Sequence, residues 1–408
     1  MNSIEYYHQG VKLVQEKDYA AAIEVFNTAL NEYPDDFMLL EGRVFVYGLQ
    51  KNKEKALADY TRMIAVDPKR PDGWNGRGNL YCDIGEYDKA IADYTQCIPL
   101  SPDGYGTYWS NRGIAYYKKG DLDTALADLN KSIESWGDPE CSSWALLHRG
   151  IVWRNKGELD KALADFMLIS SYEPEGSDAL YHTGYIWFMR EDYEQAIAYF
   201  SKAIEIRDDI VDYWLARGVC YWNKCVKNKT NFWNEEGEII DLAINDFTKV
   251  IEYSPDMTKA YFNRGVAYCA KARDSHSLIK SIVMQKVTDD AQRVLLLTQL
   301  ERLGGKNLIP QFDAILRLLR SNRDQADVLM AESLGLFVND DAQEAVEDLS
   351  RVVALEPNNA EAYYYRGLAY ALLQKKDNAL SDYEQTCALN PDHVKAATKR
   401  DELLESQK

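Results

Sequence analysis

The chain has 408 residues, of which 46% are hydrophobic, and its 65 acidic and 47 basic residues give a formal net charge of -18 at pH 7. A single compact core rarely organises a chain of this length, so we expect several domains or an array of repeats. The acidic balance argues against broad binding to nucleic acid or anionic membranes, which need clustered Lys and Arg, and favours basic or amphipathic partners.

The N-terminus and the cysteines indicate where the protein is located. The first residues, MNSIEYYHQG, lack a cationic start followed by an apolar run. No later stretch reaches the ~18–20 consecutive apolar residues that would span a bilayer. The seven cysteines show no CxxC spacing, which is typical of reduced thiols. We therefore expect a cytoplasmic protein.

One pattern recurs along the chain with a period near 34 residues. Each copy places an aromatic residue or leucine before a glycine, and further apolar residues and an alanine follow at fixed distances. The third copy has all of the features, at Trp74, Gly78, Tyr81, Ala90, Tyr94 and Pro102. The apolar positions have helical spacing, so each copy predicts two amphipathic helices joined by a turn. Because one pair cannot bury its own apolar stripe, neighbouring pairs must stack.

Nine repeats are predicted in chain order. They begin near Ser3, Phe37, Pro71, Gly106, Ser143, Ser177, Val211, Thr258 and Ala360. Repeat two has Val44 where glycine is usual, and repeat six has Asp208 where proline is usual, but both keep the alanine. A polar helix over 394–408 follows the last repeat, as the end of a stacked array requires.

The register breaks in two neighbouring repeats. In repeat seven the glycine and the alanine, Gly218 and Ala243, are separated by a short insertion near 224–238. A much longer insertion separates Gly265 from Ala345 in repeat eight, and its periodicity predicts a small helical subdomain over about 288–336. Both insertions fall between the two helices of a repeat, so we expect them on the same edge of the stack.

These breaks predict a division of the chain into three parts. The first is 1–271, which holds repeats one to seven and the first helix of repeat eight. The second is the helical insertion, 272–343. The third is 344–408, which holds the second helix of repeat eight, repeat nine and the terminal helix.

The pattern resembles the tetratricopeptide repeat, a helix–turn–helix unit. This resemblance implies an all-α, right-handed superhelical solenoid of about nine repeats with a small helical insertion in repeat eight. In that family the first helices line a concave groove at particular positions. Carried over to this sequence, the groove residues are Asn79, Asn111, Tyr117, Trp144, Leu147, Ile151, Arg154, Tyr181, Tyr185, Phe188, Met189, Leu215, Val219 and Trp222.

Aromatic residues concentrate in repeats four to seven of this groove. An exposed apolar lining of this kind usually marks a binding site, so we expect a protein or peptide partner with hydrophobic anchors and basic flanks. Alternatively, a tight superhelix or the folded-back insertion covers these residues. Some chaperone adaptors of the family clamp a carboxylate with Lys, Asn and Arg. Asn79 and Asn111 match two of their positions, but Asn75, Trp144 and His148 replace the required cations, so this activity is not carried over.

Arginine and aspartate recur together in seven of the nine repeats. The pairs, sixteen residues apart where no insertion intervenes, are Arg43 and Asp59, Arg77 and Asp93, Arg112 and Asp128, Arg149 and Asp165, Arg217 and Asp246, Arg264 and Asp348, and Arg366 and Asp382. Repeat one has Gln9 and Val25 instead, and repeat six has Thr183 and Tyr199, so both partners are missing together. We predict that each arginine binds the aspartate of its own repeat across the two helices.

No set of residues indicates a catalytic site. The sequence has no HExxH, GxSxG or phosphate-loop motif and no metal-like Cys/His spacing. His148 and His182 share one repeat position, but without a nearby carboxylate they are weak metal candidates. We expect no enzyme activity, no cofactor and no metal.

The leading functional hypothesis is a non-enzymatic protein–protein interaction scaffold or adaptor. One alternative is a regulatory or sensor protein whose groove its own insertion occludes until a partner or effector binds. Another is a non-catalytic positioning subunit of an enzyme complex.

Overall fold

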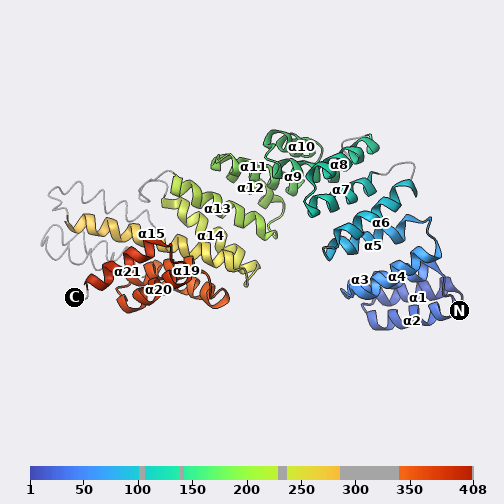
Figure 1. The fold of residues 1–408 in the computed structure, drawn as a ribbon, viewed down its shortest axis with the longest axis horizontal. Coiled ribbons are helices and arrows are strands. Elements are labelled where there is room, and N and C mark those ends of the chain that lie inside the picture. The colour runs from blue at the N-terminus through green and yellow to red at the C-terminus, as the bar shows by residue number, and fades with distance from the viewer. Residues whose placement is uncertain (101–105, 138–141, 228–236, 285–339, 407–408) are drawn as a thin grey trace. The chain divides into compact units, whose positions relative to one another are not determined.

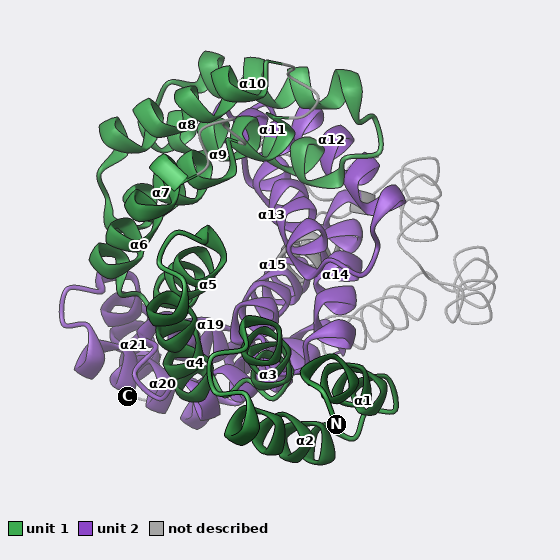
Figure 2. Cartoon of the chain, turned by 90° about the vertical axis from the view of Figure 1, so that its right-hand side faces the viewer, with its two compact units in different colours: residues 1–182 green, residues 183–408 purple. Residues whose placement is uncertain are grey.

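The structure is a computed structural model that describes residues 1–100, 106–137, 142–227, 237–284 and 340–406 (Figure 1). In these ranges the regular structure is helical and contains no strand, which confirms the predicted all-α class. The chain divides into two compact units, residues 1–182 and 183–408, and each is described by itself (Figure 2).

The helices of each unit follow one another in pairs. Unit 1 contains α1 (Ser3–Gln15), α2 (Tyr19–Glu32), α3 (Phe37–Leu49), α4 (Lys53–Val66), α5 (Pro71–Asp83), α6 (Tyr87–Leu100), α7 (Thr107–Lys119), α8 (Leu122–Trp136), α9 (Ser143–Asn155), α10 (Leu159–Tyr172) and the start of α11 (Ser177–Met189). Unit 2 contains the rest of α11, α12 (Tyr193–Ile206), α13 (Val211–Lys227), α14 (Gly237–Tyr253), α15 (Thr258–Met284), a helix over 340–355, α19 (Ala360–Leu372), α20 (Lys376–Leu389) and α21 (Val394–Ser406).

The first helix of each predicted repeat begins at the predicted residue, except that α7 starts at Thr107, directly after its N-cap Gly106. Within a unit, the second helix of one repeat packs on the first helix of the next, as α4 does on α5 and α14 on α15. Consecutive first helices also contact one another, as α7 and α9 do in unit 1 and α13 and α15 do in unit 2. In Figure 2, α7 and α9 lie on the inner side of α8 and α10. The stacked helix pairs predicted from the period are therefore present.

The recurring glycine allows the two helices of a repeat to cross closely. A Cβ atom added to Gly184 would lie 2.9 Å from the ring of Phe200, and one added to Gly367 would lie 2.8 Å from the ring of Tyr383. Phe200 and Tyr383 are at most 1% exposed. A side chain at the glycine position would therefore displace the large buried side chain that faces it.

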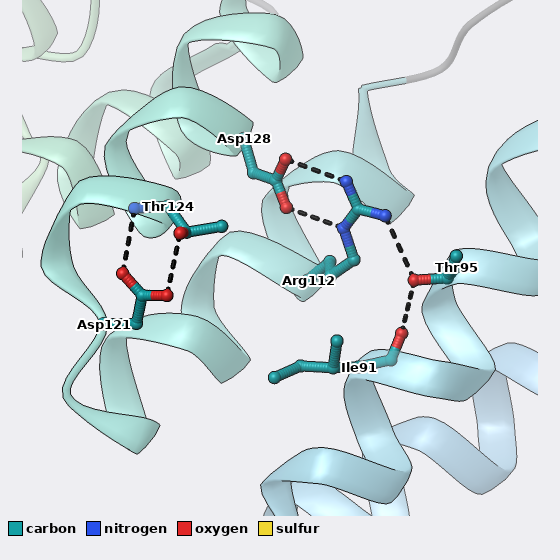
Figure 3. A network of polar contacts seen from close by, with 6 residues as sticks. All are labelled: Ile91, Thr95, Arg112, Asp121, Thr124 and Asp128. Carbon is teal, nitrogen blue, oxygen red and sulfur yellow. Dashed lines mark hydrogen bonds and ion pairs between the residues drawn. The ribbon is translucent and has the colours of Figure 1, made fainter.

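Each of the seven arginines donates two hydrogen bonds to the aspartate of its own repeat, which confirms the predicted pairing. The bonds run from Nε to Oδ2 and from Nη2 to Oδ1, at 2.6 to 2.9 Å. The aspartate side chains are 4 to 7% exposed and those of the arginines 15 to 22%. Figure 3 shows this arrangement for Arg112 and Asp128.

The same arginines also bind the preceding repeat, which the sequence did not indicate. Nη1 of Arg112 donates to Oγ1 of Thr95 at 3.0 Å, and that hydroxyl donates in turn to the carbonyl oxygen of Ile91 (Figure 3). The equivalent acceptors of the other six arginines are Asn27, Thr61, Asn130, Ser201, Thr248 and Ser350. Each guanidinium thus joins its own helix pair to the preceding repeat.

A second row of ion pairs links neighbouring repeats at their turns. Lys119 binds Asp88 at 2.6 Å and Lys156 binds Asp123 in unit 1, and Lys224 binds Glu194 at 3.1 Å in unit 2. The three carboxylates are 77 to 87% exposed, so each pair adds little to stability.

The predicted insertions fall mostly outside the described residues. This holds for the whole subdomain predicted over 288–336 and for residues 228–236 of the short insertion. On the near side of the long insertion, α15 continues to Met284. The division at 271 and 343 stays a prediction.

Candidate functional site

All of the predicted groove residues lie on first helices, and none of them is buried. Asn79, Trp144 and Met189 are exposed, and the others are half-buried. Trp144 is 58% exposed and Met189 is 45% exposed. The first helices therefore present apolar surface to solvent.

In unit 1 the asparagines of the predicted groove bind neighbouring side chains. Nδ2 of Asn111 donates to Oδ1 of Asn75 at 3.0 Å, which joins α7 to α5. The hydroxyl of Tyr94 donates to Oδ1 of Asn79 at 2.8 Å. Asn111 therefore uses one of its two amide hydrogens in a hydrogen bond within the fold, and Asn79 uses one of its acceptor sites in the same way.

A similar contact joins α7 to α9. Nδ2 of Asn155 donates to the hydroxyl oxygen of Tyr117 at 2.7 Å. The ring of Tyr117 also packs against the core cluster that contains Leu126 and Val152. Tyr117 is thus held at its ring and at its hydroxyl.

An aromatic and imidazole cluster occupies the end of unit 1. The ring of Trp144 meets that of His148 edge-on at 4.4 Å between centroids, and the ring of His182 stacks on Phe166 at 5.3 Å. Nη1 of Arg154 lies 3.1 Å from Nδ1 of His182. Because arginine can only donate, Nδ1 of His182 accepts this bond and its neutral ring carries the proton on Nε2.

Both histidines are held in the neutral form. Burial lowers the pKa of His148 to about 4, with a smaller contribution from the nearby charge of Lys118. Burial and then the charge of Arg154 lower the pKa of His182 to about 4 as well. Over the described ranges of the chain, no group of three or more His, Cys, Asp or Glu side chains is arranged to hold a metal. The two histidines are half-buried polar side chains that pack against aromatic rings.

Lowering the pH from 7 to 5 is expected to destabilise the chain through these histidines. Their folded pKa values lie below the usual 6.5, so the unfolded chain takes up protons first as the pH falls. By pH 5 each histidine should cost about 2 kcal/mol of unfolding free energy. Urea denaturation at both pH values measures this, with His182→Gln as the comparison. An equal pH dependence for wild type and variant would show that folding does not lower the pKa of His182.

In unit 2 the aromatic residues of the predicted groove are partly used by the fold. The rings of Tyr185 and Phe188 are 5.8 Å apart, and Phe188 contacts Tyr193 at 6.0 Å. Trp222 packs against the core cluster that contains Cys225 and Ile240. Met189 remains the most exposed member of this set.

Buried thiols and helix composition bear on two other function classes. Burial raises the pKa of Cys97, Cys220 and Cys269 to about 12, so these thiols stay protonated and are poor nucleophiles. In the described part of the chain, no helix is both long enough and apolar enough to cross a bilayer.

The sequence analysis missed one exposed surface. Met38, Phe45 and Leu49 on α3 are 44%, 60% and 44% exposed. They occupy the same repeat positions as the predicted groove residues, but repeats one and two were not included in the predicted groove. The signal was therefore present in the repeat register.

Comparison with known proteins identifies the repeat. Models of the tetratricopeptide repeat match residues 71–103, 110–169, 167–209 and 360–393, and a model described as TPR repeat matches 341–374. The match over 341–374 begins in the helix over 340–355 and continues into α19. This match therefore spans two successive helices of the described chain.

Individual relatives are similar over limited parts. Human tetratricopeptide repeat protein 13 is 32% identical over 89 residues, which cover 21% of this chain and 10% of the human protein. A crystal structure of a tetratricopeptide repeat protein from Parabacteroides merdae has a TM-score of 0.51 at 20% identity, over 62% of this chain and 93% of the other. YrrB, described as a TPR protein with an unusual peptide-binding site, has a TM-score of 0.35 at 26% identity, over 46% of this chain and 94% of its own.

Proposed function

Because the chain is a tetratricopeptide repeat protein, we propose that it is a non-enzymatic scaffold or adaptor that binds protein segments on its first helices. Proteins built from these repeats generally mediate protein–protein interactions and are typically non-catalytic. In unit 1 the proposed binding residues are the predicted groove residues of α5, α7, α9 and the start of α11, and in unit 2 they are those of the rest of α11 and of α13. The right-handed superhelix and the helical insertion stay predictions.

The exposure of Trp144 carries the proposal. Its indole is 58% exposed on a first helix, and its ring rests against His148. Tryptophan is among the residues that most often dominate binding energy in interfaces. An indole that is held at one edge and open to solvent at the other can insert into a pocket on a partner with little loss of side-chain conformational entropy.

The amides and the charge indicate the chemistry of the partner. Asn79 and Asn111 each retain hydrogen-bonding atoms beyond the bonds that they make in the fold, and such atoms can pair with the main chain of a bound segment. The net charge of -18 favours Lys or Arg beside the partner's apolar anchors. A peptide or protein segment with hydrophobic anchors and basic flanks fits this surface best.

Trp144→Ala is expected to reduce capture of the partner by tenfold or more. Tagged wild-type chain is used to purify partners from a cell lysate, and quantitative mass spectrometry compares them with those of the variants. Met167→Ala is the matched control, because Met167 is 55% exposed on a second helix, α10. Tyr185→Ala tests the proposed binding residues of unit 2 in the same way.

The outcome depends on a comparison between variants of equal helicity. Proteins captured by wild type and by Met167→Ala, but lost with Trp144→Ala, would support binding on the first helices. If Trp144→Ala and Tyr185→Ala both retain every partner of wild type, the first helices are not the binding surface.

A further inference from the structure

Lys271 on α15 belongs to the row of lysines that link neighbouring repeats at their turns. It follows the repeat glycine by six residues, as Lys119 and Lys224 do. Nζ of Lys271 lies 2.9 Å from Oδ1 of Asp241 on α14, which is the equivalent ion pair. The carboxylates that Lys119 and Lys224 bind are 80% and 77% exposed, but the side chain of Asp241 is 43% exposed. This pair is therefore more withdrawn from solvent than the others.

A second carboxylate, that of Asp341, shares this lysine. Oδ1 of Asp341 lies 3.6 Å from Nζ of Lys271, and its side chain is 12% exposed. Its other oxygen, Oδ2, is buried and has no hydrogen-bond partner among the described residues. One cation thus faces two carboxylates, and an oxygen of one of them is left unsatisfied. Such an oxygen is costly to bury when the carboxylate is charged.

Other repeats use an aspartate at this position differently. Asp341 stands four residues before the repeat alanine, as Asp18, Asp121 and Asp192 do. Each of those three is exposed and accepts a hydrogen bond from the backbone N–H three residues later, at the N-cap of a second helix. Asp341 instead lies inside the helix over 340–355 and is buried. A capping residue of the repeat has become a buried carboxylate in contact with α15.

The titratable groups that face Asp341 in the described part of the chain come from α14, α15 and its own helix, and they are Asp241, Lys271, Tyr268 and Asp340. α19 packs two leucines, Leu372 and Leu373, against the neighbouring alanines of α15 and of the helix over 340–355. When Asp341 is protonated, the charges of Lys271 and Asp241 cancel. When Asp341 is ionised, two carboxylates compete for one ammonium group.

Burial raises the pKa of Asp341 from 3.8 to about 6, although Lys271 acts in the opposite direction. By contrast, hydrogen bonds from Thr124 lower the pKa of Asp121, the exposed equivalent in repeat four. Because the pKa of Asp341 is raised in the folded chain, the protonated carboxyl stabilises the packed form. This contribution is present at low pH and is lost as the pH rises through about 6. Its direction is opposite to that of the two histidines.

We propose that Asp341 and Lys271 form a pH-sensitive joint between α15 and the helix over 340–355, the described helices on either side of residues 285–339. When Asp341 is protonated, the start of the helix over 340–355 stays packed on α15. When Asp341 is ionised, the packed form buries a negative charge that Lys271 only partly compensates, so the start of this helix separates from α15 more often. The joint is independent of the proposed binding of partners on the first helices.

Hydrogen–deuterium exchange of the full chain at pH 5 and pH 7.5 tests the joint. The opening constant, corrected for the pH dependence of chemical exchange, is compared for amides in the first half of the helix over 340–355. It should be about tenfold larger at pH 7.5, because the pKa is about 6 in the packed form and 3.8 in the open form. Asp341→Asn keeps the shape but cannot ionise, so its opening constant should change less than about threefold.

Asp340→Asn is the matched control, because Asp340 is the exposed neighbour of Asp341 and its loss should keep most of the tenfold change. Glu344, whose pKa burial also raises, is present in every variant and does not affect the comparison. A wild-type opening constant that is equal at the two pH values, or larger at pH 5, would overturn the proposal. The full tenfold change in Asp341→Asn would overturn it as well.

A further variant removes the competing carboxylate. Asp241→Asn leaves Lys271 to Asp341 alone, so the pH effect should shrink to about threefold or less. This variant also decides the question if Asp341→Asn does not fold, as judged by circular dichroism. A tenfold effect that persists in Asp241→Asn would contradict the sharing of one lysine by two carboxylates, and the proposal with it.

Discussion

Asp128→Ala is expected to lower the free energy of unfolding by about 3 to 5 kcal/mol. The substitution removes both acceptors of the Arg112 guanidinium, which is only 15% exposed and cannot lose its charge. A buried cation is then left with the single neutral acceptor Thr95. Urea denaturation followed by circular dichroism measures the loss.

Two controls separate a stranded charge from loss of a favourable ion pair. Replacing Arg112 and Asp128 together by leucine should cost less than Asp128→Ala alone, because no buried charge is left unpaired. Asp88→Ala breaks a pair whose carboxylate is 80% exposed, and it should cost less than about 1 kcal/mol. Equal costs for the single and double variants would show that the pair itself supplies the stability.

Phe26→Ala is expected to cost about 3 to 5 kcal/mol, because it opens a cavity in a close-packed part of the chain. Phe26 is 1% exposed, and its ring fills the space beside Gly10 and Gly42, which have no side chains. Denaturant unfolding of the full chain measures the change in free energy.

Phe45→Ala is the matched control in the neighbouring helix. Phe45 is 60% exposed, so its removal should change the unfolding free energy by no more than about 0.5 kcal/mol. A cost for Phe45→Ala close to that for Phe26→Ala would mean that the Phe45 side chain belongs to the core.

The repeat period predicted most of the described fold because the same contact recurs at the same position. The Arg and Asp positions could be paired from the sequence since both are replaced together in repeats one and six. The bonds from Nη1 to the preceding repeat could not be predicted from the sequence because the acceptor residue varies among Asn, Ser and Thr. These three side chains all offer an acceptor oxygen, but no single residue type recurs at the position. Notably, Met167 occupies this acceptor position in repeat five, directly before the repeat whose arginine is replaced by Thr183.

The site was less predictable than the fold because exposure depends on neighbours. Transfer of repeat positions placed all the groove residues on first helices, but it could not show that Trp222 rests on a core cluster while Trp144 is exposed. The extent of α15 was also not evident. No glycine or proline follows Lys271 before Met284, so nothing in the chain stops the helix where the repeat would normally turn.

Hydrogen–deuterium exchange of the chain, free and saturated with a partner purified on it, tests most directly whether the first helices bind. We expect slower exchange in α7, α9 and α13 of the complex, with little change in α8, α10 and α14. Slower exchange confined to the second helices, with α7, α9 and α13 unchanged, would contradict it.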